Sequence, residues 1–245
     1  MGFADLNEWE ILQGSFTLMF VLISIILGLT ILLKYFSIKD KIFIFVGVTW
    51  IFLSSGWWGN TFSFLSIILF NYTFEPFLFL FLGNVFIPVA LLCWIYAICH
   101  LIYKKSKNKI LALFLAICVP YEIILIILLI INPSLVGTMR SKFDSKPELL
   151  PMIFQIFALL VAIITGFIFS IVSMKSKDPE IKWKGRFLLC GFISFTIGSF
   201  MDSFITFDPI TLVVVRLILI ASSILYYLGF LLPDRIAKLL IPKAD

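Results

Sequence analysis

Stretches of about twenty apolar residues recur along this chain, and they constrain its fold more than any other feature. A helix needs about 20 mainly apolar residues to cross the hydrocarbon core of a bilayer. The chain has 245 residues, of which 62% are hydrophobic and only 13% are charged. A soluble domain of this composition would lack the polar surface that must face water. We therefore predict an all-α, polytopic membrane protein with a single transmembrane domain over residues 1–245.

Seven such stretches predict a bundle of seven transmembrane helices. The expected spans are 12–34, 42–58, 76–103, 109–131, 149–174, 187–206 and 210–232. Residues 59–74 are apolar but too short for a separate span after the second one. We expect them to form either an interfacial helix or an extension of the second span, bent near Gly56 and Gly59.

The distribution of basic residues predicts the orientation in the membrane. Fifteen Lys and Arg residues fall in alternate connections and in the C-terminal segment, within 34–41, 104–109, 175–186 and 235–243. Only three fall on the opposite side, all in the loop 132–148. Because Lys and Arg are enriched in cytoplasmic loops, the N-terminus is expected outside and the C-terminus in the cytoplasm. The net charge of +5 mostly reflects this asymmetry, so nucleic acid is not an expected partner.

Three charged side chains are predicted to lie at one depth inside the membrane. Arg216 is the only basic residue within an apolar stretch, and Glu122 and Asp202 lie in two others. A rise of about 1.5 Å per residue places all three roughly 20 to 24 Å above the inner face. A charge at membrane depth costs about 2.5 to 3.5 kcal/mol on insertion scales, so such residues usually pair or serve function.

This layer of charges supports two interpretations. In the first, it forms an outer-facing pocket in which Arg216 meets an anionic group. The candidate ligand-binding residues are Arg216, Glu122, Asp202, Asn84, Gln155 and Tyr227. In the second, the charges form an ion pair between helices that orders the bundle, since intramembrane charges usually pair with one another.

Other motifs narrow the function classes. The last span contains no Lys, so a retinal Schiff base at the usual place is excluded and no cofactor is expected. No HExxH, GxSxG, P-loop or GxGxxG motif occurs and the only histidine is His100, so enzymatic activity and a metal site are not expected. Residues 71–73 form a glycosylation sequon at Asn71 on the expected outer side.

Two segments resemble known seven-helix proteins. They are MKSKDPEIKWKGRFLL, from Met174 to Leu189, and SSILYYLGFLLPD, from Ser222 to Asp234. These stretches resemble uncharacterised archaeal seven-helix membrane proteins and, more loosely, the seven-helix sensor regions that precede histidine kinases. In such sensors a kinase follows the last helix, whereas this chain ends soon after Pro233. The resemblance implies a seven-helix fold and carries no site residue over to this chain.

The leading functional expectation is a receptor-like sensor of the plasma membrane without its own output domain. A ligand near Arg216 would shift the last three spans, and a separate cytoplasmic or membrane partner would read the change at Lys182, Lys184 and Arg186. The alternatives are a transporter of a small solute or ion that uses the same polar layer, and a scaffold or subunit of a membrane complex. A transporter would show flux in proteoliposomes, whereas a subunit would show stable association with another membrane protein.

Overall fold

The computed structural model describes residues 6–204 and 208–241, and it is an all-α bundle apart from one short hairpin. Residues 205–206, at the end of the expected span 187–206, lie outside the described residues, and so does Lys243. Over the described residues, six helical segments are long and apolar enough to cross a membrane. Their lipid-facing surface is covered by exposed Leu, Ile, Val and Phe side chains, as expected where the solvent is hydrocarbon. The prediction of a polytopic helical membrane protein is confirmed at this level.

The six segments match six of the predicted spans closely. They are α1 (Glu8–Ile38), α2 with η2 and α3 (Ile42–Leu53, Ser54–Trp57 and Trp58–Phe70), α4 with α5 (Pro76–Asn84 and Ile87–Leu101), η3 with α6 (Lys104–Ser106 and Lys107–Ile131), α7 (Leu149–Met174) and α9 (Pro209–Leu231). Residues 58–70 form α3, which follows α2 directly through a 3-10 turn, so α2, η2 and α3 make one continuous helical segment.

Helix α8 (Pro179–Phe204) has 26 residues, but it begins earlier than the expected span at 187. Pro179 suits a first helical position because it has no N–H to satisfy there. The carboxylate of Asp178 accepts the backbone N–H of Glu180 at 2.8 Å, and Glu180 pairs with Lys184 at 2.6 Å. These interactions draw the polar segment 179–186, which was expected to be a loop, into the helix. A short helix, α10 (Asp234–Leu240), follows α9.

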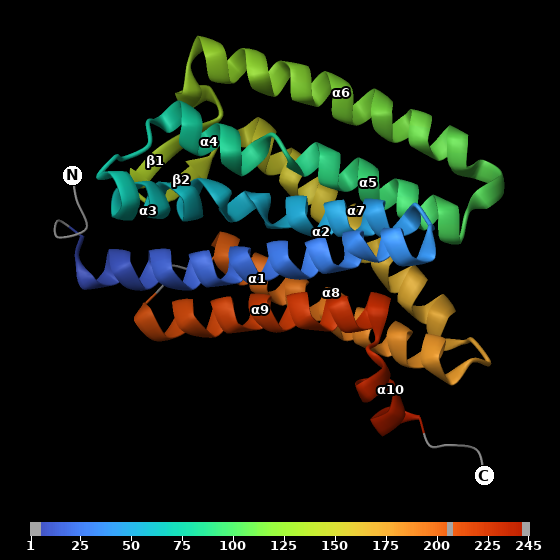
Figure 1. Cartoon of the computed structure of the whole chain (residues 1–245). Helices are drawn as coiled ribbons and strands as arrows, with labels where there is room; N and C mark the ends of the chain where they lie inside the picture. Colours follow the sequence, from blue (N-terminus) through green and yellow to red (C-terminus); the bar gives the residue numbers. More distant parts are fainter. Residues whose placement is uncertain (1–5, 205–207, 242–245) are drawn as a thin grey trace.

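The helices run roughly side by side along one long axis (Figure 1). Helix α1 packs against α2 and α9, α8 packs against both α7 and α9, and α5 packs against α2 and α6. In Figure 1, α6 and α9 lie on opposite sides of the bundle. Helix α1 begins at the end of the bundle opposite to the one where α9 ends (Figure 1).

Glycines allow a close crossing between helices α1 and α2. A Cβ added at Gly47 would lie 2.6 Å from the carbonyl oxygen of Gly28, and one added at Gly28 would lie 3.0 Å from the carbonyl oxygen of Gly47. Both distances are too short for a side chain, so the two backbones are in direct contact. Small residues at such positions let transmembrane helices gain van der Waals contact where lipid offers no hydrophobic driving force.

The centre of the bundle is aromatic. Trp50 of α2 stacks on Tyr226 of α9 with ring centroids 3.9 Å apart, and Trp94 of α5 and Phe192 of α8 pack around them. All four side chains are at least 95% buried. Aromatic pairs add roughly 0.5 to 1.5 kcal/mol beyond their buried area. This cluster ties four of the helices together.

A β-hairpin closes the end of the bundle where α1 begins (Figure 1). After η4 (Pro133–Leu135), strands β1 (Gly137–Ser141) and β2 (Asp144–Pro147) pair in antiparallel register, with Gly137 opposite Pro147 and a bulge between Met139 and Ser141. Phe143, in the turn, is fully buried and packs edge-on against Phe64 of α3. The sequence analysis expected only a loop here.

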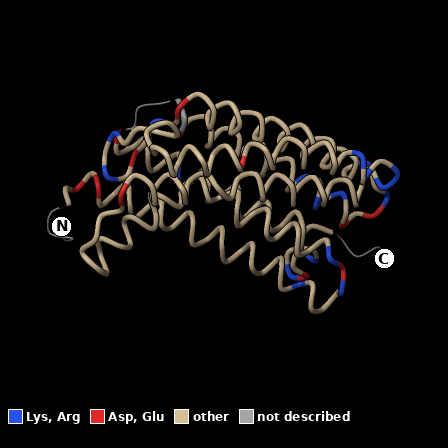
Figure 2. Tube along the Cα trace, turned by 90° about the horizontal axis from the view of Figure 1, so that it is seen from above, with Lys and Arg blue, Asp and Glu red and all other residues tan. Residues whose placement is uncertain are grey.

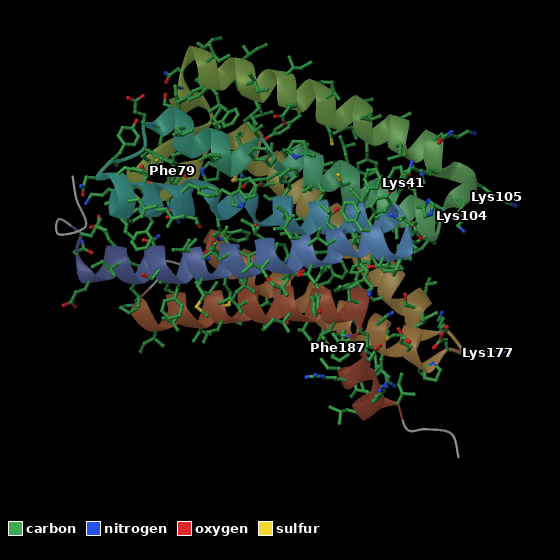
Figure 3. All side chains as sticks on the ribbon, in the orientation of Figure 1. Lys41, Phe79, Lys104, Lys105, Lys177 and Phe187 are labelled. Atoms are coloured by element: carbon green, nitrogen blue, oxygen red, sulfur yellow. The ribbon has the colours of Figure 1, made fainter. Side chains whose placement is uncertain are left out.

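Charged residues gather at the two ends of the bundle and are scarce between them (Figure 2). Lys41, Lys104, Lys105 and Lys177 lie at the end opposite to the hairpin (Figure 3). The basic connections that were assigned to one side of the membrane are therefore grouped at one end of the structure.

Candidate functional site

Arg216 and Asp202 form an ion pair in the hairpin half of the bundle. The distance from Arg216 Nη1 to Asp202 Oδ1 is 2.7 Å, and the side chains are only 2% and 19% exposed. Asp202 belongs to α8 and Arg216 to α9, and these two helices pack against each other. Gly198 faces Leu219 on this interface and brings the two backbones close together. The predicted depth match between Arg216 and Asp202 is thus realised as a direct contact.

Two hydrogen bonds from other helices complete the surroundings of this pair. The indole N–H of Trp57, in η2, donates to Asp202 Oδ2 at 2.7 Å. On the other side, Arg216 Nε donates to the hydroxyl of Thr17, in α1, at 3.1 Å. Buried charges are tolerated when they are paired and hydrogen-bonded in this way. The four residues therefore join α1, the break in the second span, α8 and α9.

A chain of polar contacts links this ion pair to the hairpin. Thr17 donates its hydroxyl proton to the carbonyl oxygen of Gln13 at 2.7 Å. The side-chain amide of Gln13 donates in turn to the carbonyl oxygen of Phe143 at 3.3 Å. A salt bridge of 3.0 Å between Lys142 and Glu10 holds the hairpin to the same helix. We call the contacts from Phe143 through Gln13 and Thr17 to Arg216 and Asp202 the polar chain.

Helix α1 supports Arg216 through matched spacing on two parallel helices. Ser24, seven residues after Thr17, lies 3.0 Å from Ser223, seven residues after Arg216, oxygen to oxygen. Both serines are buried. Seven residues are close to two helical turns, so both pairs lie on one line of contact between α1 and α9. Arg216 and Ser223 therefore lie on the same face of α9, the face that contacts α1.

Glu122 lies apart from the ion pair, although it was predicted to share its layer. It belongs to α6, which packs against α5 and α4 and lies across the bundle from α9 (Figure 1). Its Oε2 atom is enclosed and has no hydrogen-bond partner among the described residues. The estimate of depth along each helix could not reveal this lateral separation.

The remaining candidate ligand-binding residues form a second, smaller contact. Gln155 of α7 donates to the side-chain oxygen of Asn84 at 3.0 Å, and Asn84 donates to the carbonyl oxygen of Leu80 at 2.8 Å. This pair fixes α7 against the end of α4. Tyr227 lies eleven residues beyond Arg216, about 16 Å along the helix, so the two side chains cannot share one small pocket.

Two hollows among the described residues are open grooves on the outside of the bundle. One, of about 380 Å³, lies between α6 and α7 and is lined by apolar side chains that include Tyr121 and Phe154. The other, of about 470 Å³, lies between α1 and α3 and includes Leu18 and Phe64. Neither is lined by Arg216, Asp202 or Glu122. In this conformation, Arg216 is engaged by groups of the protein itself.

Two acids near the hairpin end have shifted pKa values. Burial raises the pKa of Asp144, the charge of Arg140 opposes the rise, and the carboxylate of Asp202 adds to it. By contrast, the backbone N–H of Thr211 donates to Asp208 at 2.7 Å and lowers the pKa of this cap of α9.

The candidate coupling residues lie together on the first turns of α8. Lys184 pairs with Glu180, Arg186 lies 4.4 Å from the ring centre of Trp183, and Lys182 is exposed. Asn71, the glycosylation candidate, is exposed and ends α3 in a left-handed conformation, with φ of 53°. Among the residues that the structure describes, no group of three or more His, Cys, Asp or Glu side chains is placed to hold a metal ion.

No protein-family model, curated protein or solved structure matches this chain. The candidate site therefore rests on its own geometry. Sequence reasoning missed two members of it, Trp57 and Thr17. The indole of Trp57 faces Asp202, and the residue is half-buried. The signal that was present is the break at SSGW, which turns Trp57 out of the regular helical register.

Proposed function

We propose that this protein is a seven-helix integral membrane protein that works as a receptor-like sensor, with its N-terminus outside and its C-terminus in the cytoplasm. Helices α7 and α9 run toward the same end of the bundle, so α8, which connects them, returns across it (Figure 1). That path supports α8 as the seventh crossing. The grouping of basic residues at one end supports the orientation, because such residues favour the cytoplasmic side.

The polar chain is the observation that carries the sensor proposal. It connects an outer hairpin to a buried charge pair at the contact of α8 with α9. A charge pair in a medium of low polarity has two clearly different states, closed and separated, and the interconversion shifts both helices. A ligand that binds near the hairpin, or an anionic group that replaces Asp202 beside Arg216, would bias this equilibrium.

In this proposal, the signal leaves the protein at the basic first turns of α8. Lys182, Lys184 and Arg186 precede the apolar part of the helix that carries Asp202. A rigid shift of α8 would therefore move these three side chains at the cytoplasmic face. A separate signalling partner, in the plasma membrane or beneath it, would read that shift. The loose resemblance to seven-helix sensor regions agrees with this arrangement.

Distance measurements between spin labels test the coupling. Labels on Lys105→Cys and Lys177→Cys, in a chain without its native cysteines, report on the inner ends of the bundle. The sensor proposal expects Asp202→Asn to change the distance distribution between the labels in nanodiscs. Glu122→Gln, which removes a carboxyl group of α6 outside the ion pair, is the matched control and leaves the distance distribution unchanged. If Asp202→Asn has no effect, the ion pair is only a brace for the bundle.

Native mass spectrometry after mild extraction tests the partner. A protein that remains bound to the wild type and is lost when Lys182, Lys184 and Arg186 are changed to Gln supports the sensor. The control changes Lys104, Lys105 and Lys107 to Gln, which removes the same charge from another inner connection. Solute or ion flux in proteoliposomes that depends on Arg216 would instead favour a transporter.

A further inference from the structure

Two membrane segments are interrupted side by side within the bundle. The second segment changes from α2 to α3 through the 3-10 turn at Ser54–Trp57, and the third changes from α4 to α5 at residues 85–86. The turn packs against α4. A Cβ added at Gly83 would lie 3.9 Å from the carbonyl oxygen of Gly56, so the glycine backbones of the two breaks face each other.

The space beside Gly56 is open. Among the residues that the structure describes, no atom would lie within 4 Å of a Cβ added to Gly56, and this residue is exposed although it lies in the middle of a span of 29 residues. Irregular backbone at membrane depth is tolerated where it is buried in protein or lines a water-filled cavity. An exposed glycine at a helix break therefore indicates contact with water and not with lipid tails.

Buried polar atoms without partners gather on the same segment. Ser55, in the break, and Thr61 and Ser63, just beyond it, are at most 1% exposed, and their hydroxyls find no hydrogen-bond partner within residues 6–204 and 208–241. The side-chain oxygen of Asn60 is enclosed and likewise has no partner in that part of the chain. Such atoms are normally satisfied by protein or by ordered water, because leaving one unpaired costs about 1 to 3 kcal/mol.

The second break adds another acceptor. Pro88 has no N–H to donate to the carbonyl oxygen of Asn84, which lies four residues earlier. Hydroxyls, an amide oxygen and this carbonyl together offer both donors and acceptors. Residues 54–63 and 83–88 contain no ionisable side chain. The nearby charge of Asp202 is already paired with Arg216, so this combination suits an uncharged ligand.

We propose that the paired breaks form a water-accessible site, entered beside Gly56, that binds a small uncharged molecule through hydrogen bonds. Water is the smallest such molecule, and a neutral polar solute offers the same chemistry. Discontinuous helices near the middle of the membrane are a recurrent way to present backbone and hydroxyl groups to such ligands. The site is distinct from the Arg216–Asp202 pair and does not depend on the signalling role.

Cysteine accessibility tests this site. Gly56→Cys and Gly83→Cys are made in a chain whose four native cysteines are replaced, because both positions can accept a side chain without a clash. The proteins are reconstituted in nanodiscs and treated with the charged reagent MTSET. Leu217→Cys is the control, since Leu217 is 49% exposed on the outside of α9, beside Arg216 and at the same depth. A thiol reacts as the thiolate, which requires water.

The site predicts that both glycine variants react at least about tenfold faster than Leu217→Cys, since only a hydrated cleft supports the thiolate. Glycerol and urea are then the solute probes, with sucrose as the control for osmotic effects. Saturable protection by glycerol or urea assigns the site to a neutral solute, and labelling without protection assigns it to water. Reaction of both well-folded, monodisperse glycine variants at the rate of Leu217→Cys would overturn the proposal.

Discussion

Arg216 Nη1 lies 2.7 Å from Asp202 Oδ1, and this contact decides how two charges can remain inside the membrane. Isolated, each would be expensive at this depth. Together they form a neutral pair, and the bonds from Trp57 and to Thr17 satisfy further donors and acceptors. Because the four residues come from four different segments, the pair also fixes how α1, η2, α8 and α9 are arranged.

Removal of one charge of this pair should strongly destabilise the protein. Asp202→Asn leaves the Arg216 guanidinium buried without a counter-charge, and breaking such a pair costs about 3 to 5 kcal/mol. Thermal unfolding in detergent, or steric trapping in bicelles, measures the loss of unfolding free energy. Glu180→Gln breaks the partly exposed i,i+4 pair with Lys184 and should cost less than about 0.5 kcal/mol.

The double variant Arg216→Met with Asp202→Leu should lose less stability than the two single changes added together. Apolar residues in place of a buried ion pair are often neutral in their effect on stability, whereas each single change strands one charge. A double-mutant cycle measures this non-additivity. Strictly additive losses would mean that Arg216 and Asp202 do not interact in the membrane.

Trp57→Phe should lower the stability of the protein without leaving a cavity where the ring lies. The change removes the N–H that donates to Asp202 but leaves an aromatic ring beside Phe20 and Phe195. Hydrogen bonds to charged groups contribute about 1.5 to 3 kcal/mol, so a loss of that order is expected. Trp58→Phe is the control, because Trp58 donates to the neutral hydroxyl of Ser54 at 3.2 Å. Equal effects of the two changes would contradict the special role of Trp57.

The pH dependence of stability should carry a signature of Asp144. Burial raises the pKa of this carboxyl group, so its contribution to stability is fully present below the ordinary pKa of about 3.9 and is lost as pH rises through the raised value. Asp144→Asn should therefore flatten the fall of stability over that window. Unfolding temperatures recorded across a pH series measure the difference.

Asp208 provides a control of opposite sign. Hydrogen bonds from Thr211 lower the pKa of Asp208, so its contribution is present above the ordinary carboxyl range and is lost as pH falls. Asp208→Asn should reduce the loss of stability that occurs as pH falls. Asp144→Asn should instead reduce the loss that occurs as pH rises. Profiles that change in the same direction for both variants would show that the burial assigned to Asp144 is wrong.

The sequence predicted the long apolar helices of this fold, but not the start of α8 or the hairpin. Apolar length predicted the helices of the bundle, because the bilayer fixes how many residues must be apolar. It could not predict that α8 begins at Pro179, since polar residues at the membrane surface fit a helix and a loop equally well. The hairpin 137–147 was missed for a similar reason: its short strands are mostly polar and partly exposed, and the fully buried Phe143 and Val136 lie outside the strands themselves.

The sequence predicted how deep the candidate-site residues lie in the membrane, but not where they lie around the bundle. Rise per residue placed Arg216 and Asp202 at one level, and they meet. The same reasoning placed Glu122 at that level, but α6 packs against α5 and α4, on the other side of the bundle. Lateral position depends on which helices are neighbours, and for Trp57 it also depends on a helix break. Neither is encoded in the spacing of polar residues within one span.

The orientation in the membrane yields a sharp test in intact cells. Arg140 lies on the exposed part of the hairpin, and Lys105 and Lys177 are exposed at the other end of the bundle. With the basic connections in the cytoplasm, Arg140→Cys should react with an impermeant maleimide added to whole cells. Lys105→Cys and Lys177→Cys should react only after the membrane is permeabilised. The pair at 105 and 177 also tests α6 and α7, since both positions must label on the same side if these two helices both cross the membrane. Labelling of Lys177→Cys but not Lys105→Cys in whole cells would remove one of those crossings, and reversed labelling of all three positions would invert the proposed topology.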